Sequence, residues 1–339
     1  MDNHTIEEIS KPVAVVMCVY SYFLLAMGTS GNILLLLTLL FKKHHRRKPV
    51  PEIIPRHANL YPSCRVVSGN ASDRLLMLLT TSDLCCLWVL VLRYLIILTS
   101  GGDIRTVSDS FCKIHTFSSM VCSNLSIALL CIFSVHRTIG IQWPLVSHTW
   151  LTKKRLNTYL VFALMIILLK HTSVLFLFQL SEIGQRKKCD LNDQWPTLGK
   201  VYYNIEFSTH CCLGYSVLII SNICLFVALK RKTRKNLVTT SRDKSGPNDA
   251  THKGINTART LLFFTIIQLL TSVPFLVVIE FNDQLNLQMV PEQHKLTVYF
   301  GLLLAMFTNN AINYFLMIGI SKTFMNEARD YFIHLKKLC

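Results

Sequence analysis

Seven apolar stretches divide the 339-residue chain, and each exceeds the roughly 20 residues that a helix needs to cross a ~30 Å hydrocarbon layer. A segment that spans lipid must satisfy its backbone hydrogen bonds internally, so each stretch is expected to be a helix. The sequence therefore predicts an all-α membrane protein, a seven-transmembrane helix bundle with spans at residues 12–41, 75–99, 111–142, 156–180, 201–229, 258–281 and 296–320.

The distribution of basic residues predicts the orientation of the chain. The formal net charge is +16, and the surplus of Lys and Arg lies in the first, third and fifth connectors and in residues 321–339. Basic connectors favour the cytoplasmic side, so residues 1–11 are expected outside, on a plasma-membrane protein, and the C-terminal segment inside. These cations are also expected to attract anionic membrane lipid. Nucleic acid is not an expected partner, because the basic residues flank apolar spans.

The segment before the first span carries acids and no Lys or Arg up to residue 10. The apolar run after it is much longer than the core of a cleaved signal peptide, so the first span is expected to stay in the membrane. Asn3 begins a glycosylation sequon on the expected outer side. Sequons also begin at Asn70 and Asn124, on the cytosolic side and within span three, so only Asn3 is expected to carry a glycan.

Two of the twelve cysteines lie where oxidising conditions are expected. Cys112 is at the outer end of span three, and Cys189 is in the loop between spans four and five. We expect them to form a disulfide, which typically stabilises a fold by about 2–4 kcal/mol; two free thiols are the alternative. The spacing of the cysteines does not match a metal site.

A short amphipathic helix is expected after span seven, at residues 322–337, on the inner membrane face. Apolar side chains recur there at helical spacing, with charged residues between them. They are Phe324, Ala328, Tyr331, Phe332 and Leu335.

Asp83 lies in the middle of span two, where an ionisable side chain is costly unless it is paired, hydrogen-bonded or hydrated. Asn309, Asn310 and Asn313 lie in the middle of span seven, and Asn309 and Asn313 share one face of it. Asn32 lies at a comparable depth in span one, and Ser126 lies in span three. These side chains are expected to form one polar cluster. It is either an ion site or a hydrogen-bond network that holds the helices together.

Ionisable and polar side chains near the outer ends of the spans are candidates for a ligand pocket. Two carboxylates, Glu206 and Glu280, would favour a cationic group on the ligand. Alternatively, Glu280 faces the loop and is solvated, and Glu206 pairs with Arg93 or Lys113. The candidate pocket residues are Arg93, His115, Ser119, Glu206, His210, Glu280 and Tyr299.

Two further residues are candidates for a role in conformational change, although each has a structural alternative. Arg137, at the cytoplasmic end of span three, either contacts a partner or extends to the membrane interface. Pro274 removes a backbone hydrogen bond in the middle of span six, and the resulting kink serves as a pivot or only as packing.

In this order, several residues resemble the rhodopsin-like family of G-protein-coupled receptors across nearly the whole chain: Gly31-Asn32, Ser82-Asp83, Cys112, Arg137, Pro144-Leu145, Pro274 and Asn313. Residues 221–225 and 309–314 resemble the peptide-receptor branch that includes FMRFamide-type receptors. The resemblance implies a heterotrimeric G protein as partner, with Arg137, Pro144 and Leu145 in coupling. It also implies an allosteric sodium ion near Asp83, Ser126, Asn309 and Asn313, and no other cofactor.

The chain departs from the family pattern where the family has its switch motifs. Where the family usually has an acid before the arginine, this chain has His136 before Arg137. Residues 271–274 and 313–317 also differ from the family motifs at these positions. Protonation of His136 would put two cations side by side, so we expect raised basal signalling. Span seven has no lysine that could bind retinal, which disfavours light sensing.

The sequence favours a receptor for an extracellular ligand, such as a basic amidated neuropeptide. The alternative is a transporter of a small solute or an ion, with Asp83 and Lys170 along its path, but the internal repeats of transporters are not apparent. An enzyme is not expected, because no catalytic residues stand at a spacing that supports catalysis.

Overall fold

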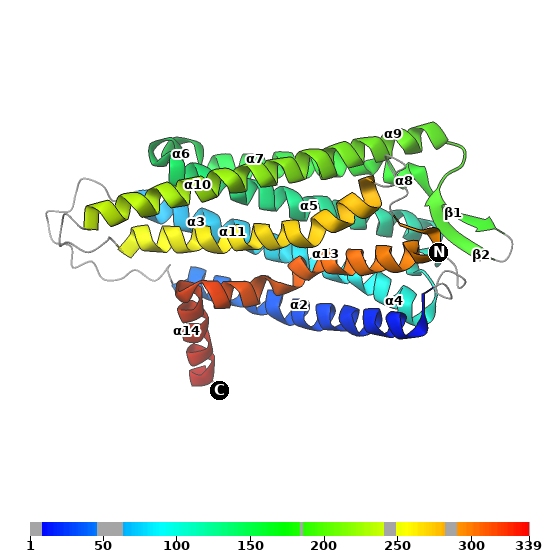
Figure 1. Cartoon of the computed structure of the whole chain (residues 1–339), viewed down its shortest axis with the longest axis horizontal. Coiled ribbons are helices and arrows are strands. Elements are labelled where there is room, and N and C mark those ends of the chain that lie inside the picture. Colours follow the sequence, from blue (N-terminus) through cyan, green and yellow to red (C-terminus); the bar gives the residue numbers. More distant parts are fainter. Residues whose placement is uncertain (1–8, 46–63, 184–185, 241–248, 282–289, 339) are drawn as a thin grey trace.

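The computed structural model describes residues 9–45, 64–183, 186–240, 249–281 and 290–338, most of which are helical. The long helices run side by side along one axis (Figure 1). The first of them, α2 (Lys11–His45), begins at the end of the bundle that carries a β-hairpin, and α14 (Lys322–Leu338) lies at the opposite end. We call these the hairpin end and the basic end.

Within the described residues, seven helical segments run along the bundle, and three of them contain a π-helical turn. They are α2; α3 (Cys64–Cys86) continued by Leu87–Val91 and α4 (Leu92–Ser100); α5 (Asp109–Gln142); α7 (Lys153–Thr172) with α8 (Val174–Leu177); α9 (Pro196–Glu206) continued by Phe207–Gly214 and α10 (Tyr215–Thr240); α11 (Asp249–Phe275) continued by Leu276–Phe281; and α13 (Glu292–Ile320).

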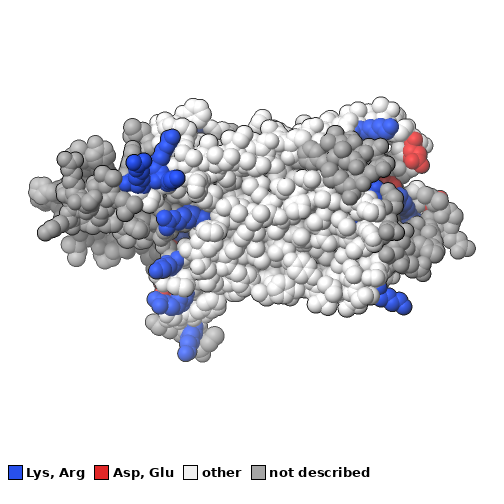
Figure 2. All heavy atoms as spheres, in the orientation of Figure 1, with Lys and Arg blue, Asp and Glu red and all other residues white. Residues whose placement is uncertain are grey.

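These segments have a composition suited to a bilayer. Among the described residues, six have the length and apolarity to cross one, and the seventh contains a shorter apolar stretch, Leu262–Val278. Figure 2 shows a wide band without charged side chains on the face in view, with Lys and Arg at its two ends. Large apolar side chains such as Phe162 and Leu169 are 67% and 78% exposed. Such surface belongs in lipid, so the chain is a multi-pass membrane protein with the expected bundle.

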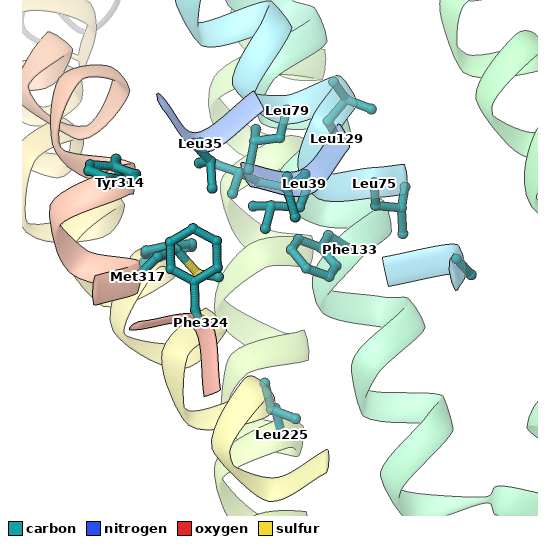
Figure 3. Packing of buried hydrophobic residues seen from close by; sticks show 14 of the residues in the cluster. Leu35, Leu39, Leu75, Leu79, Leu129, Phe133, Leu225, Tyr314, Met317 and Phe324 are labelled. Carbon is teal, nitrogen blue, oxygen red and sulfur yellow. The ribbon is translucent and has the colours of Figure 1, made fainter. Parts of the chain in front are cut away.

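The interior consists mainly of leucine and aromatic side chains. Figure 3 shows the cluster nearer the basic end, where Leu35, Leu75 and Phe133 meet Tyr314 and Phe324. A second cluster lies nearer the hairpin end, around Leu87 and Phe300. Since lipid is as apolar as these side chains, close packing rather than the hydrophobic effect holds the helices together.

One close helix contact depends on the absence of a side chain. A Cβ atom added to Gly28 on α2 would lie 2.5 Å from Leu87 Cδ1 and 3.0 Å from Ala311 Cβ. Glycine and alanine at this crossing let α2 and α13 approach closely, as small residues do at helix interfaces in membranes.

The loop between α8 and α9 folds into a hairpin that the sequence analysis did not predict. Strand β1 (Phe178–Ile183) pairs antiparallel with β2 (Arg186–Leu191). The fourth span was expected to reach residue 180, but its helix ends at Leu177. The backbone N–H of Leu180 donates instead to Asp109 Oδ1 at 2.9 Å.

The expected disulfide between Cys112 and Cys189 is confirmed and ties the hairpin to α5, with the two Cα atoms 5.6 Å apart. Both cysteines are buried in a small cluster with Val174, Phe178 and Tyr202. The cross-link therefore fixes the centre of the loop over the hairpin end of the bundle.

Helix α14 turns away from the bundle axis after α13 and points outward from the bundle at the basic end (Figure 1). Phe324 and Ala328 are buried against the bundle, with the Phe324 ring 6.1 Å from the ring of Tyr314. Phe332 and Leu335, on the same predicted apolar face, are exposed. An ion pair of 2.9 Å between Lys42 and Glu327 links α2 to α14.

A short helix, α6 (Pro144–Trp150), connects α5 and α7 at the basic end.

Candidate functional site

Asp83 is the centre of a buried polar cluster that joins α3, α5 and α13. Its Oδ1 accepts hydrogen bonds from Ser126 Oγ at 2.9 Å and from Asn310 Nδ2 at 2.7 Å, and its Oδ2 accepts one from Asn313 Nδ2 at 2.5 Å. Among the described residues, no basic side chain forms an ion pair with this carboxylate. Burying a carboxylate is costly unless hydrogen bonds replace those to water. The three hydrogen-bond donors therefore lower the free-energy cost of burying Asp83.

Of the three asparagines expected in the cluster, Asn310 and Asn313 donate to Asp83, whereas Asn309 does not hydrogen-bond to it within the described residues. Asn309 is 1% exposed, and its Oδ1 has no hydrogen-bond partner within the described segments. Asn32 on α2 donates from Nδ2 to the backbone oxygen of Asn310 at 2.8 Å, while its own Oδ1 is likewise unpartnered there. The cluster thus combines a carboxylate with buried amide oxygens, which are ligands that a hard cation accepts.

Near the hairpin end, Arg93 is bound by an acid that the sequence analysis did not assign to it. Arg93 Nε and Nη2 donate to the two carboxylate oxygens of Asp103 at 3.0 and 2.7 Å. Arg105 also donates to Asp103, at 2.9 Å. The Arg93 guanidinium lies over the ring of Tyr94, 4.9 Å from its centre. Arg93 is therefore held in place by contacts within the protein.

The same arrangement shifts the titration of Asp103. Burial alone would raise its pKa, but the hydrogen bonds and charges of Arg93 and Arg105 outweigh burial and hold the pKa well below its usual range. Asp103 also begins a short helical turn, because its carboxylate accepts from the backbone N–H of Arg105 at 3.0 Å. One carboxylate thus neutralises two guanidinium groups in part and shapes the loop between α4 and α5.

Three further candidate pocket residues lie in this half of the bundle. His115 and Ser119 are one turn apart on α5, each 9% exposed, and Ser119 Oγ is 3.3 Å from His115 Nδ1. On α13, the Tyr299 hydroxyl is 3.5 Å from that of Tyr94, and its ring packs against Phe275.

Glu206 forms an ion pair with Lys170, which the sequence analysis considered only for a transport path. Glu206 Oε2 is 2.7 Å from Lys170 Nζ, with side-chain exposures of 16% and 14%. Asn124 donates from Nδ2 to Glu206 Oε1 at 2.7 Å and accepts from Lys170 Nζ at 2.8 Å. These contacts join α5, α7 and α9.

The suggested pairing of Glu206 with Arg93 or Lys113 is wrong. Arg93 is bound to Asp103, and Lys113 pairs with Asp109 one turn away at 2.6 Å. Since Lys170 neutralises Glu206, this carboxylate is not a free counter-charge for a cationic ligand.

Two histidines flank this ion pair. His171 is fully buried, with Nδ1 2.9 Å from the Tyr202 hydroxyl and Nε2 3.8 Å from Glu206 Oε2. The predicted pocket residue His210 lies one turn after Glu206 and interacts electrostatically with it. A buried charged pair beside two imidazoles is a polar site on the α5, α7 and α9 side of the bundle.

The side chain of Glu280 lies outside the described residues, although its backbone belongs to the π-helical turn after α11. Pro274 lies inside α11, and the helix changes to this π-helical turn two residues later. Figure 1 shows the helix bending near this end. A proline that removes one backbone hydrogen bond accounts for the bend.

Arg137 lies on α5 at the basic end, with its guanidinium carbon 5.7 Å from the centre of the Phe133 ring. Its Nε has no hydrogen-bond partner within the described ranges, and the acid whose charge acts on it is Asp73 on α3. Pro144 and Leu145 begin α6 close by in sequence, but their side chains lie outside the described residues.

The expectation that His136 carries a charge next to Arg137 does not fit its surroundings. His136 is 4% exposed, and neither ring nitrogen has a hydrogen-bond partner in the part of the chain that the structure describes. A charged imidazolium without a partner is costly to bury, so these surroundings favour the neutral ring. Arg137 is therefore the cation at this position.

Removing one member of the ion pair between Lys170 and Glu206 should destabilise the bundle. Glu206→Gln leaves the Lys170 ammonium without its counter-charge, and we expect the free energy of unfolding to fall by about 3 kcal/mol. Lys170→Met with Glu206→Gln removes both charges and should recover most of that loss. Thermal unfolding of the purified protein measures both effects.

Lys113→Met is the control for the loss of an ion pair. It breaks the exposed pair between Lys113 and Asp109, and such a pair typically contributes less than about 1 kcal/mol to stability. If Glu206→Gln is no less stable than this control, the pair does not hold the helices together.

The pair between Arg93 and Asp103 should contribute stability that depends on pH. The folded-state pKa of Asp103 lies below its ordinary value of about 3.9, so this contribution is complete above that pH and is lost as the pH falls towards the folded-state pKa. Asp103→Asn should lower the free energy of unfolding by about 3 kcal/mol at pH 7. The difference from wild type should shrink below about pH 4, which unfolding temperatures at pH 7, 5 and 3 would show.

Asp193→Asn, which changes an exposed acid in the neighbouring loop, is the control and should match wild type throughout. A difference for Asp103→Asn that stays constant from pH 7 to pH 3 would contradict the assignment.

Comparison with known protein families identifies the family to which the chain belongs. The family described as "7 transmembrane receptor (rhodopsin family)" matches residues 64–316, about three quarters of the chain and six of its seven spans. No curated protein matches the chain. The match agrees with the resemblance noted in the sequence, and it favours a receptor over a transporter or an enzyme. The chain belongs to the rhodopsin family of seven-transmembrane receptors, which detect extracellular ligands and couple to G proteins.

Proposed function

We propose that this receptor is a plasma-membrane receptor for a neuropeptide or another small extracellular ligand. The single observation that carries this proposal is the family match over residues 64–316. The ligand site is proposed at the hairpin end and the G-protein site at the basic end, because basic connectors favour the cytoplasm. The N-terminus is then extracellular, and glycosylation of Asn3 in intact cells tests this orientation; an unmodified Asn3 in a surface-expressed receptor would count against it.

The proposed ligand site comprises Arg93, His115, Ser119, Glu206, His210, Glu280 and Tyr299. A basic group, as in an arginine-containing amidated peptide, would have to compete with Lys170 for Glu206 or bind Glu280. Competition is physically reasonable, since guanidinium binds a carboxylate through two parallel hydrogen bonds and an ammonium group through one contact at a time. A basic agonist whose potency is unchanged by both Glu206→Gln and Glu280→Gln would overturn the basic-ligand proposal.

Signalling is proposed to follow from a shift between two packings of the bundle. A ligand shifts this equilibrium only as far as it binds one packing better than the other. The polar contacts between helices, around Asp83 and around Glu206, are the contacts that must differ between the packings. The bend after Pro274 lets the basic end of α11 move relative to α13, and Arg137 then meets the G protein together with Pro144 and Leu145.

His136→Asp should lower basal G-protein activation, measured as nucleotide exchange in reconstituted membranes. An aspartate beside Arg137 restores a charge-assisted hydrogen bond of about 1.5–3 kcal/mol in the resting packing. We expect the basal rate to fall by about tenfold or more, which corresponds to roughly 1.4 kcal/mol or above.

His136→Asn is the matched control, because it changes size similarly without adding a charge, and its basal rate should stay within about twofold of the wild-type rate. An unchanged basal rate in His136→Asp, with unfolding temperatures equal to wild type, would contradict the role proposed for this position.

The Asp83 cluster is proposed to hold a sodium ion. The residues fit such an ion: a buried carboxylate has only neutral hydrogen-bond donors among its described partners, and the buried amide oxygens of Asn309 and Asn32 are unpartnered there. Asp83 would balance the charge, and Ser126, Asn309 and Asn313 would contribute or orient oxygen ligands. A bound cation would stabilise the packing in which these groups converge.

Sodium should therefore raise the unfolding temperature of the wild-type protein relative to potassium at equal ionic strength. At a concentration ten times the Kd the expected gain is about 1.4 kcal/mol. Asp83→Asn should remove the difference between the two salts, and the exposed Asp193→Asn should keep it. A wild-type protein that is equally stable in both salts would rule out the ion.

A further inference from the structure

A groove of about 550 Å³ opens on the outside of the bundle near the basic end, between α2, α3 and α7. This volume lies within the range of small-molecule sites, about 300–1,000 Å³. Its lining combines three basic side chains, Lys43, Arg74 and Lys153, with an apolar wall that includes Leu39, Leu78 and Leu156. It lies apart from Asp83 and from the hairpin end, and one of its lining residues, Asp73, is the acid whose charge acts on Arg137.

The two kinds of lining residue are ordered along the membrane normal. On each of the three helices the basic residue lies about one turn nearer the end of the bundle than its apolar neighbour. The pairs are Lys43 and Leu39 on α2, Arg74 and Leu78 on α3, and Lys153 and Leu156 on α7. Residues three or four apart share a face of a helix. The groove is therefore cationic at its mouth and apolar towards the middle of the membrane.

The positive charge at the mouth is not balanced by the acid in the groove. Lys43, Arg74 and Lys153 are all exposed. Arg74 donates from Nη1 to Asn157 Oδ1, which orients its guanidinium along the wall. The one carboxylate among the lining residues, Asp73, is 3.2 Å from Lys42 and so is already shared with a fourth cation. A bound anion would relieve this surplus.

The start of α7 adds to the surplus. Thr152 caps the helix, and its first turn contains Lys153, Lys154 and Arg155 and no acid. The N-terminal end of a helix carries a partial positive charge that favours anions and disfavours cations. Three cations at this position repel the helix dipole and one another unless an anion lies near them.

We propose that this groove binds one anionic glycerophospholipid from the membrane leaflet on the basic side. The headgroup phosphate would lie among Lys43, Arg74 and Lys153, and the first acyl carbons would lie against Met77 and Leu78, with the buried Leu39 and Leu156 forming the floor of the groove. A soluble phosphate would use only the mouth of the groove, whereas a lipid matches both its charge and its apolar wall. The inference does not depend on the identity of the agonist or of the G protein.

The test measures retention of phosphatidylserine by the full chain, using native mass spectrometry of protein purified in micelles that contain phosphatidylcholine and phosphatidylserine. Arg74→Gln with Lys153→Gln removes two charges from the groove. Each basic residue near an anionic lipid contributes about a fivefold factor in affinity, so binding should weaken by about 25-fold.

Lys154→Gln with Arg155→Gln is the matched control, because it removes the same charge from the same turn of α7 at residues that do not line the groove. Its binding should stay within about threefold of wild type. Glycerophosphoserine, which has the headgroup without acyl chains, should not displace the lipid at equal concentration.

Equal losses in the two double variants would show diffuse surface attraction and overturn the proposal, as would unchanged binding in both. Displacement by glycerophosphoserine at equal concentration would show that the apolar wall plays no part. Unfolding temperatures in phosphatidylcholine alone should be the same for all variants. If the groove variant is unstable there, Lys43→Gln alone carries the same test, with an expected loss of about fivefold.

Discussion

The fold depends on the need to compensate every charge that lies among the packed helices. In the middle of a bilayer no bulk water is available, so an ionisable side chain must find its partners within the protein. Three solutions occur here: Asp83 has neutral hydrogen-bond donors, Glu206 has a cation from another helix, and Arg93 shares a carboxylate at the hairpin end. The same contacts position the helices, because the side chains that satisfy each charge come from different elements.

This dual role links stability to signalling. A buried ion pair between helices has few acceptable geometries, because a helix that slides or rotates separates the two charges. Asp83 connects α3, α5 and α13, and Glu206 connects α5, α7 and α9. Helix α5 takes part in both networks. A ligand that alters either network acts on the helix that also carries Arg137, which gives a physical route from the hairpin end to the basic end.

Much of this arrangement follows from the sequence, because the depth of a residue in the membrane can be counted along a span. The spans, the disulfide between Cys112 and Cys189 and the clustering around Asp83 follow from depth. The partner of Glu206 does not, since depth leaves the rotation of each helix about its axis undetermined. The same limit explains why the sequence does not show which of Asn309 and Asn310 contacts Asp83, since successive residues on a helix point about 100° apart. The hairpin was missed because Phe178 and Leu180 extend an apolar run that a span would also contain.

At the basic end, the absence of an acid before Arg137 moves its electrostatic partner from its own helix to a neighbour. Asp73, whose charge acts on Arg137, lies on α3 and is also 3.2 Å from Lys42 on α2. Lys42 in turn is 2.9 Å from Glu327 on α14. A chain of charges therefore connects α5 to α14 through two other helices. Any movement of α14 that releases Glu327 leaves Lys42 with Asp73 alone, and this weakens the attraction that Asp73 exerts on Arg137. With His136 in place of an acid, the negative charge that acts on Arg137 comes from a neighbouring helix and not from the preceding residue.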